Sequence, residues 1–255
     1  MKGDMIMKKY VVYGAATPGF GEQTARTLIE HGNIVIGLFE AADAKNAECL
    51  QKEFGSSIDL RMIDICDYNS LRAVVESIDE AIDGFVSAAF TFDMDNIDDF
   101  DFELAERLFR ANYHGPMYLA VELKKKMVSE SSVVFVTSTE SDRGSFGGIS
   151  YAASKAAVHN MIKSLSCNWG KKEKIRANAV AAGWIGGEMD NDGPFEVSMN
   201  ITPLGRLGTA KEVADAVEFL LSEKASFVNA SVLYVDGGYL AVDDIAKYEY
   251  EASKG

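Results

Sequence analysis

Residues 10–21 read YVVYGAATPGFG, and this stretch decides the fold. The apolar run from Tyr10 to Tyr13 predicts a buried strand, the glycines predict a tight turn, and the spacing of Thr24 and Ile29 predicts a helix. Glycines let the main chain approach a pyrophosphate closely, and the start of a helix offers it free N–H groups and a positive dipole end. The order of strand, turn and helix therefore predicts a dinucleotide-binding unit, with an ordinary turn as the alternative.

Strand and helix patterns alternate along the rest of the chain. Short apolar runs predict strands at residues 34–39, 60–63, 84–86, 133–136 and 175–180. Helical spacing is present at residues 71–78, 102–127, 151–169 and 210–221, and a bend is expected at Gly115 and Pro116. No repeat or Pro/Ser-rich linker divides the chain. We therefore predict one α/β domain over residues 1–255, a Rossmann-type doubly wound parallel sheet flanked by helices on both faces.

Composition argues against several classes of protein. The 255 residues are 47% hydrophobic, which is enough for a sizeable core, and the net charge of −14 repels nucleic acid and anionic membranes. Cys49, Cys66 and Cys167 are far apart and have no nearby histidines, so neither a disulfide framework nor a metal site is expected. No signal peptide or membrane-spanning apolar stretch is expected. These observations predict a soluble, cytoplasmic protein.

Tyr151 and Lys155 lie one turn apart in the predicted helix at residues 151–169, so their side chains share a face. A free tyrosine titrates near ~10, and an ammonium within a few Å lowers that pKa because it favours the phenolate. Ser138 follows the apolar run at 133–136, which places its hydroxyl at the carboxyl edge of a strand, where open α/β sheets bind ligands. The three side chains predict acid–base chemistry on a carbonyl, although many amphipathic helices carry this tyrosine and lysine spacing by chance.

The serine and the Tyr-x-x-x-Lys pattern, with Asn112 in an earlier helix, resemble the short-chain dehydrogenase/reductase family. The resemblance implies that Tyr151 donates and accepts the proton and that Lys155 lowers its pKa and binds the nicotinamide ribose. It also implies that Ser138 positions the substrate oxygen and that Asn112 supports a proton-relay water. The alternative for Asn112 is a solvent-facing side chain. The similarity covers about residues 9–240.

The resemblance also implies a cofactor site. Its residues would be Gly14, Thr17, Gly19, Phe20, Gly21, Phe39, Glu40, Asp64, Ile65, Ala88, Gly183 and Ile185, together with Tyr151 and Lys155. Phe39 and Glu40 would meet the adenosine ribose, and Ile185 would meet the nicotinamide carboxamide. The chain departs from the family pattern in a longer glycine turn, in SAAF at residues 87–90 in place of Asn-Asn-Ala-Gly, and in two glycines at 186–187 in place of threonine.

The choice of cofactor is predicted from charge. Lysine and arginine are absent from residues 10–25 and 27–44. A ribose 2′-phosphate would therefore meet the carboxylate of Glu40 and no obvious cation, so NAD is favoured and NADP is less expected. The alternative for Glu40 is a solvated residue at the start of a helix.

Apolar side chains are expected around the substrate. The implied substrate-binding residues are Phe90, Ser138, Phe146, Tyr151, Trp184 and Met189, with Phe195 and Met199 as further walls. Residues 186–206 would form a lid, and the tail at 241–255 is expected to be polar. Such walls favour a bulky alicyclic or aromatic substrate, unless the lid residues only pack the lid against the domain. The aspartates at 93–101 lack the spacing of a calcium loop and are expected to form a solvated acidic turn.

The leading hypothesis is an NAD(H)-dependent oxidoreductase that interconverts a secondary alcohol and a ketone. Two alternatives remain: a 3-oxoacyl thioester reductase, and a dinucleotide-binding scaffold or sensor without catalysis. Acyl carriers are acidic, which disfavours the first on an acidic chain. The predicted helix at 151–169 is apolar on more than one face, so a homo-oligomer, a dimer or tetramer, is expected.

Overall fold

A parallel sheet forms the centre of the computed structural model, which describes residues 7–186 and 195–254. Its strands are β1 (Lys9–Tyr13), β2 (Ile34–Phe39), β3 (Ile58–Met62), β4 (Ile82–Ser87), β5 (Met127–Ser138), β6 (Arg176–Ala182) and β7 (Val232–Val235). In the described part of the chain the strand order is β3-β2-β1-β4-β5-β6-β7, and every neighbouring pair is parallel. The order reverses between β1 and β4, which is where open α/β sheets form a ligand crevice.

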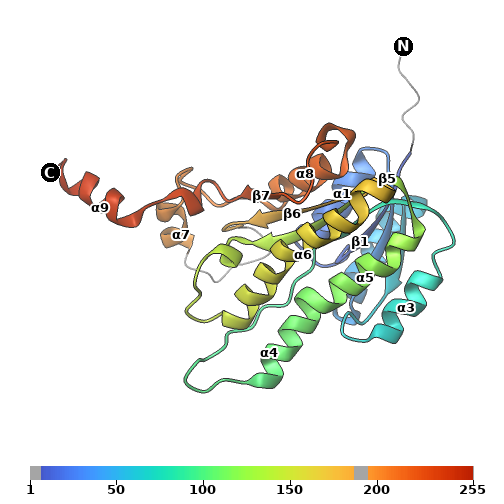
Figure 1. The fold of residues 1–255 in the computed structure, drawn as a ribbon, viewed down its shortest axis with the longest axis horizontal. Coiled ribbons are helices and arrows are strands. Elements are labelled where there is room, and N and C mark those ends of the chain that lie inside the picture. The colour runs from blue at the N-terminus through green and yellow to red at the C-terminus, as the bar shows by residue number, and fades with distance from the viewer. Residues whose placement is uncertain (1–6, 187–194, 255) are drawn as a thin grey trace, which may run out of the picture.

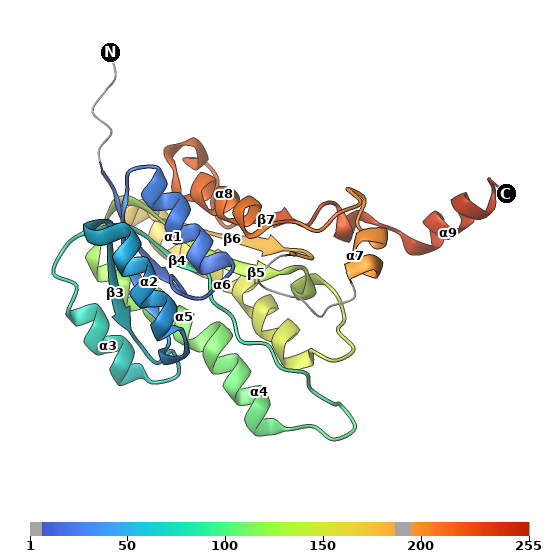
Figure 2. The same cartoon turned by 180° about the vertical axis from the view of Figure 1, so that it is seen from behind.

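Helices cover both faces of the sheet, as Figures 1 and 2 show from opposite sides. They are α1 (Phe20–Glu30), α2 (Ala44–Phe54), α3 (Tyr68–Glu76), α4 (Phe102–Phe109), α5 (Gly115–Leu123), α6 (Ile149–Glu173), α7 (Phe195–Ile201), α8 (Ala210–Leu221) and α9 (Asp244–Ala252). Buried side chains of α3, α5 and α6 pack on one face, and those of α1 and α8 pack on the other. The single α/β domain and the doubly wound class predicted from the sequence are thus confirmed.

The turn between β1 and α1 requires glycine at two positions. Gly14 has a φ of 87°, and a Cβ atom there would lie 2.7 Å from the side chain of Ala89. A Cβ atom on Gly21 would lie 1.9 Å from the carbonyl oxygen of Gly14. The start of α1 therefore packs directly on the turn, and the turn packs on the segment after β4. This close approach brings the first helix amino terminus to the crevice between β1 and β4.

Two predicted segments differ from the structure. The helix expected at residues 102–127 is irregular at a π-helical turn, Arg110–His114, which lies before the expected bend at Gly115 and Pro116. The tail at 241–255 contains helix α9, which extends away from the body of the domain (Figure 1). Ile245 and Tyr248 on α9 are 73% and 74% exposed, so this segment is not purely polar.

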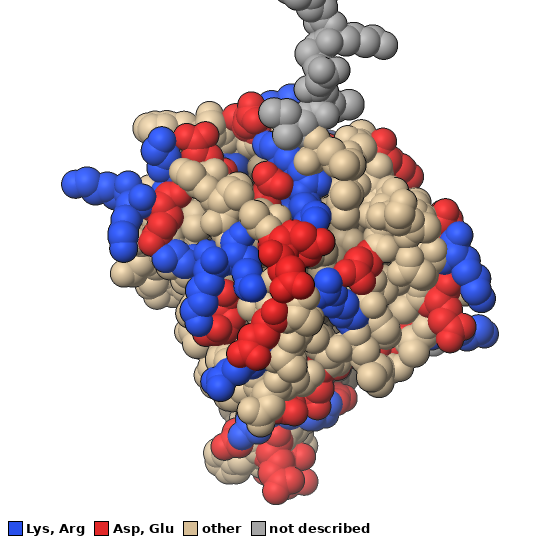
Figure 3. Space-filling view, turned by 90° about the vertical axis from the view of Figure 1, so that its right-hand side faces the viewer, with Lys and Arg blue, Asp and Glu red and all other residues tan. Residues whose placement is uncertain are grey.

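The surface carries both signs of charge. On the face seen in Figure 3, acidic and basic side chains are interspersed among uncharged ones. No helix in residues 7–186 and 195–254 is both long enough and apolar enough to cross a membrane.

Candidate active site

Ser138, Tyr151 and Lys155 come together at the carboxyl edge of the sheet, as the sequence predicted. Ser138 is the last residue of β5, and its hydroxyl accepts from the N–H of Glu140 at 3.1 Å and lies close enough to the phenol of Tyr151 to influence its acidity. Tyr151 and Lys155 are both buried in the first turns of α6, at 8% and 3% exposure. The ammonium nitrogen of Lys155 lies 5.8 Å from the centre of the Tyr151 ring and 3.4 Å from the carbonyl oxygen of Val136.

Burial changes the acidity of both side chains. Desolvation raises the pKa of Tyr151 well above its ordinary value, although the hydrogen bond from Ser138 opposes this shift, and the charge of Glu140 adds to it. Desolvation lowers the pKa of Lys155 from 10.5 to about 7. The phenol therefore keeps its proton firmly near neutral pH, while the lysine holds its proton weakly. That a charged Lys155 lowers the pKa of Tyr151 stays a prediction.

Asn112 lies in the π-helical turn between α4 and α5 and is buried, with 2% exposure. Its side chain is not solvent-facing: the amide nitrogen donates to the carbonyl oxygen of Thr91 at 2.8 Å, and its oxygen accepts from the Thr91 N–H at 2.9 Å. This pair of bonds fixes the segment that follows β4. π-Helical turns are common at functional sites because they redirect side chains locally. The proposed relay water remains untested.

The segment after β4 supplies an aromatic wall beside Tyr151. The ring of Phe90 lies 6.0 Å from that of Phe20 and 6.2 Å from that of Tyr151. Phe92 lies closer, edge-on to Tyr151 with ring centres 5.1 Å apart. Sequence reasoning missed Phe92, although alternate residues of an extended segment point the same way and Phe90 was already chosen.

The other expected walls behave differently. Phe146 stays a prediction as a pocket wall, and its side chain is fully exposed in the described structure. Trp184 packs edge-on against Tyr239 at 6.3 Å, and its indole N–H is buried without a hydrogen-bond partner among residues 7–186 and 195–254. Met189 and the side chain of Phe195 lie outside the described residues. Met199, in α7, is 36% exposed.

The aspartates at 93–101 do more than form a solvated turn, which corrects that expectation. Asp95 is buried, and its carboxylate accepts from the N–H groups of Ile149 and Ser150 at 2.7 Å each. Asp101 caps α4, and Asp93 forms an ion pair with Arg107 at 2.8 Å. In the described chain no group of three or more His, Cys, Asp or Glu side chains could hold a metal ion.

The carboxyl end of β2 presents carboxylates to the glycine turn. Glu40 is half-buried, and one of its oxygens accepts from the hydroxyl of Tyr13 at 3.2 Å and from the N–H of Ile65 at 3.0 Å. Burial raises the pKa of Glu40, while these two hydrogen bonds oppose that shift. Thr17, in the turn itself, donates to Asp43 at 2.6 Å. Asp43 was missed because no local pattern links it to Thr17.

Phe39 and Asp64 differ in their surroundings. The side chain of Phe39 packs in a small cluster with Ala16, Ala47 and Leu50, so it faces the protein interior. Asp64 is exposed, and its carboxylate accepts from the N–H of Cys66 at 2.8 Å. Of the two, only Asp64 therefore has a side chain available to a bound group.

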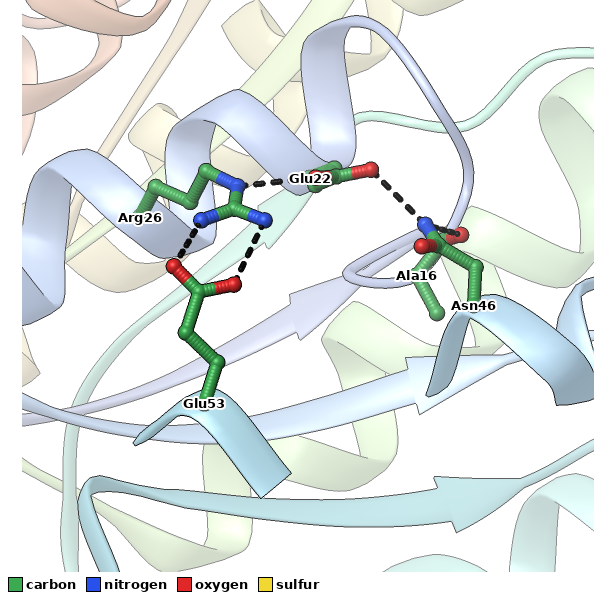
Figure 4. A network of polar contacts seen from close by, with 5 residues as sticks. All are labelled: Ala16, Glu22, Arg26, Asn46 and Glu53. Atoms are coloured by element: carbon green, nitrogen blue, oxygen red, sulfur yellow. Dashed lines mark hydrogen bonds and ion pairs between the residues drawn. The ribbon is translucent and has the colours of Figure 1, made fainter. Parts of the chain in front are cut away.

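Arg26, a basic residue on α1 close to the glycine turn, is already engaged, as Figure 4 shows. Arg26 donates to Glu22 at 2.8 Å and to both oxygens of Glu53, at 2.6 and 2.9 Å. Asn46 joins this network by donating to Glu22 and to the carbonyl oxygen of Ala16. The guanidinium is thus held on two carboxylates and ties α1 to α2.

The opposite end of the crevice is built by the loop after β6. Gly183 donates to the carbonyl oxygen of Val235 at 3.0 Å, and a Cβ atom on it would lie 2.7 Å from Asp236. Ile185 forms an isolated parallel bridge with Gly208. A cleft separates this loop from the glycine turn and is lined by Gly19, Glu22, Gln23, Arg26, Gly186, Leu207, Gly208, Thr209, Ala210 and Lys211. Ala88, just after β4, is buried, and its N–H donates to the carbonyl oxygen of Tyr13.

A family model described as enoyl-(acyl carrier protein) reductase matches residues 14–240. The chain belongs to the short-chain dehydrogenase/reductase family. It is 28% identical to cis-4-hydroxycyclohexanecarboxylate dehydrogenase of Sinomonas cyclohexanicum, covering 94% of this chain and 100% of that protein. It is 29% identical to the 3-oxoacyl-[acyl-carrier-protein] reductase FabG of Chlamydia muridarum, covering 92% and 98%. The crystal structure of BdcA in complex with NADPH has a TM-score of 0.82 and 26% identity, covering 90% and 93%.

This short-chain dehydrogenase/reductase is an NAD(P)-dependent oxidoreductase that acts on CH–OH groups, as the sequence predicted. Its residues fit a dinucleotide. The glycine turn leaves no room for a Cβ atom at Gly14 or Gly21, α1 begins at the turn, and the cleft beside it is open. The glycine turn could hold the pyrophosphate, the end of β2 could hold the adenosine, and the loop after β6 could hold the nicotinamide.

Proposed function

We propose that the enzyme interconverts a secondary alcohol and a ketone with NAD(H), with Tyr151 as the general acid and base. The observation that carries this proposal is that Tyr151 and Lys155 are buried one turn apart at the start of α6, with the hydroxyl of Ser138 close to the phenol at the end of β5. A hydroxyl pair with this arrangement can hold one substrate oxygen and exchange one proton with it. The non-catalytic scaffold reading is disfavoured because a scaffold does not need these side chains buried together.

Each of the three side chains has a distinct task in this reaction. Ser138 donates a hydrogen bond to the substrate oxygen and keeps it near the phenol. Tyr151 gives its proton to that oxygen during reduction and takes it back during oxidation. Lys155 can take up or release a proton at neutral pH as the phenol gives up or regains its own, because its pKa is about 7. The bound nicotinamide supplies or accepts the hydride. Asn112 keeps the segment after β4 in place through Thr91.

We assign NAD rather than NADP as the cofactor because two carboxylates lie at the adenosine end. Glu40 is fixed by Tyr13 and Ile65, and Asp43 is fixed by Thr17. A 2′-phosphate near them would meet both carboxylates, while the guanidinium of Arg26 is already held by Glu22 and Glu53. Structural relatives include an NADPH complex, so the carboxylates, not the fold, carry this assignment. We place the role at the ribose on Glu40 and Asp43, since the side chain of Phe39 faces inward.

We propose a bulky apolar, alicyclic substrate because Phe90 and Phe92 flank Tyr151. Apolar walls stabilise an apolar ligand by roughly 25 cal/mol per Å² of buried surface, so a ring should bind better than a polyol. A relative named for a hydroxycyclohexanecarboxylate supports this class. The FabG relative supports a 3-oxoacyl thioester as the second candidate.

The test is a substrate panel followed by nicotinamide absorbance at about 340 nm. Cyclohexanone, a sugar ketose and an acetoacetyl thioester are each reduced with NADH and with NADPH. The proposal expects the highest kcat/KM for cyclohexanone with NADH. Faster turnover of the thioester supports the second candidate, and faster turnover of the ketose refutes the apolar pocket. Cofactor binding without any turnover supports the scaffold.

We also propose a homo-oligomer, a dimer or tetramer, in the cytoplasm. Val121 on α5 and Phe219 on α8 are 43% and 39% exposed, and Leu233 and Tyr234 on the edge strand β7 are 37% and 42% exposed. Apolar side chains on an edge strand favour pairing with another chain. Cys49, Cys66 and Cys167 are free thiols, which supports a reducing compartment. Light scattering of the purified protein measures the assembly, and a monomer at micromolar concentration refutes it.

A further inference from the structure

Asp95 is a buried carboxylate that the reaction described above does not use. It is 6% exposed, although it lies in a segment whose neighbours Met94, Asn96 and Ile97 are exposed. Burial raises its pKa, but hydrogen bonds from Ser150 and Ile149 outweigh that effect, so the pKa is lowered overall. The carboxylate is therefore ionised at neutral pH, and it is held in place by the strong, charge-assisted hydrogen bonds that it accepts from two N–H groups.

The two N–H groups belong to the first turn of α6. Ile149 and Ser150 donate to the two different oxygens of Asp95, each at 2.7 Å. Gly148, at the N-cap of α6, has no side chain to satisfy them. Asp95 therefore replaces the missing cap from a distant segment. Tyr151 is the next residue of the helix, so the cap lies directly beside the proposed general acid.

The same segment carries the aromatic wall. Asp95 donates its own N–H to the carbonyl oxygen of Gly147 at 3.2 Å, which closes a second link to the residues before α6. Phe92 lies edge-on to Tyr151, and its ring lies close to Gly148: a Cβ atom built there would be 3.3 Å from the ring. Met94 lies even closer to Gly147, where a built Cβ atom would be 2.6 Å from its terminal methyl group. Both ends of the wall thus depend on contacts that Asp95 anchors.

We propose that Asp95 is a positioning residue, whose carboxylate clamps the segment 90–95 to the start of α6 and so sets Phe92 against Tyr151 in the substrate pocket. The proposal rests on the proposed function, because it assigns Tyr151 the proton transfer. Asp95 acts through Phe92 and Tyr151 and does not touch the substrate. A displacement of about 1 Å at a reacting group can cost up to about 100-fold in rate, so the clamp has consequences for catalysis.

The test compares Asp95→Asn and Asp95→Ala with the control Asp99→Asn, which removes the same charge from an exposed residue further along the loop between β4 and α4. The rate of hydrogen exchange at the amides of Ile149 and Ser150 measures whether the clamp is intact, and this measurement does not require an activity assay. We expect these amides to exchange faster in both Asp95 variants than in the wild type, and at the wild-type rate in the control. Unchanged exchange in Asp95→Ala overturns the clamp. Thermal melts identify a variant that fails to fold, and Asp95→Asn, which keeps the side-chain volume, then carries the test.

Kinetics with cyclohexanone and NADH read the positioning role. We expect kcat/KM to fall at least about tenfold in Asp95→Ala and less in Asp95→Asn, while the Kd of NADH stays unchanged. Phe92→Leu should raise KM when it is introduced into the wild type, but it should raise KM little further when it is introduced into Asp95→Asn. The control Phe146→Leu, at a fully exposed ring, should leave KM unchanged in both backgrounds. Additive effects of Asp95 and Phe92, or an Asp95 variant equal to Asp99→Asn, overturn the role. A wild type inactive on every substrate refutes the proposed function itself.

Discussion

Replacing Lys155 by methionine should make the protein more stable near pH 8 and remove a pH dependence that the wild type has. Burial lowers the pKa of Lys155 from 10.5 to about 7, because the interior disfavours the ammonium. Between these two values the unfolded chain binds a proton that the folded chain releases. Stability from this residue is therefore full above pH 10.5 and is lost progressively as the pH falls toward 7. Methionine fills similar space and carries no proton.

The magnitude follows from the width of that window. Each unit of pKa difference corresponds to about 1.4 kcal/mol, so stability rises with a slope approaching ~1.4 kcal/mol per pH unit. Between about pH 8 and pH 10 the wild type should gain on the order of 2–3 kcal/mol relative to Lys155→Met. The raised pKa of Tyr151 acts above pH 10 and lies outside this interval.

Urea unfolding at a series of pH values, followed by tryptophan fluorescence, measures the effect. Protein concentration is held fixed, because association would change the apparent stability. Other titrating groups cancel in the difference between wild type and variant. Lys163→Met, an exposed lysine of the same helix, is the control and should follow the wild type. Parallel curves for wild type and Lys155→Met over the interval would refute the reasoning.

Three further predictions concern the crevice. Tyr151→Phe should lower kcat by ~10²–10⁴-fold with the Kd of NADH unchanged, and a kcat within threefold of the wild type would contradict the mechanism. Glu40→Gln and Asp43→Asn should each tighten NADP binding by about fivefold in a fluorescence titration, since each removes roughly 1 kcal/mol of repulsion; no change in either variant argues against the assignment. Gly21→Ala should destabilise the fold by about 1–3 kcal/mol and weaken NADH binding, because its Cβ would lie 1.9 Å from a carbonyl oxygen, whereas Gly144→Ala, with open space, should melt like the wild type.

The fold could be predicted because its signals are local. The apolar run at Ile34–Phe39 coincides with β2, and the glycine turn, read from residues 10–21, joins β1 to α1 as expected. Period and turn residues decide such elements, and a parallel sheet follows from their alternation. Element ends were less accurate: β5 begins at Met127, well before the apolar run, because the polar residues 129–132 interrupt the apolar pattern.

The candidate site was predicted in part for the same reason. Tyr151 and Lys155 could be paired from their spacing, because helix geometry alone places them on one face. Phe146 was placed in the pocket by its position near Tyr151 in the sequence, but loops do not constrain direction as helices do, and its ring faces solvent. Asp95 and Asp43 were missed because their partners, Ile149 and Thr17, are distant in sequence.

The residues that transfer the proton and the residues that select the cofactor and substrate lie on different elements of the fold. The proton-transfer group lies on one helix and at the end of one strand, whereas Thr17 with Asp43 and Thr91 with Asn112 each join a strand-end loop to a different element. A substitution in the glycine turn should therefore affect the cofactor end of the crevice, whereas one in the loop after β4 should also affect Tyr151 through Phe92 and Asp95. Glu40 and Asp43 lie on one turn, in which the Asp43 N–H donates to the carbonyl oxygen of Glu40 at 2.9 Å, so their effects on a 2′-phosphate should be coupled. Under the NAD assignment that we propose, we therefore expect the preference to change only when both carboxylates are removed.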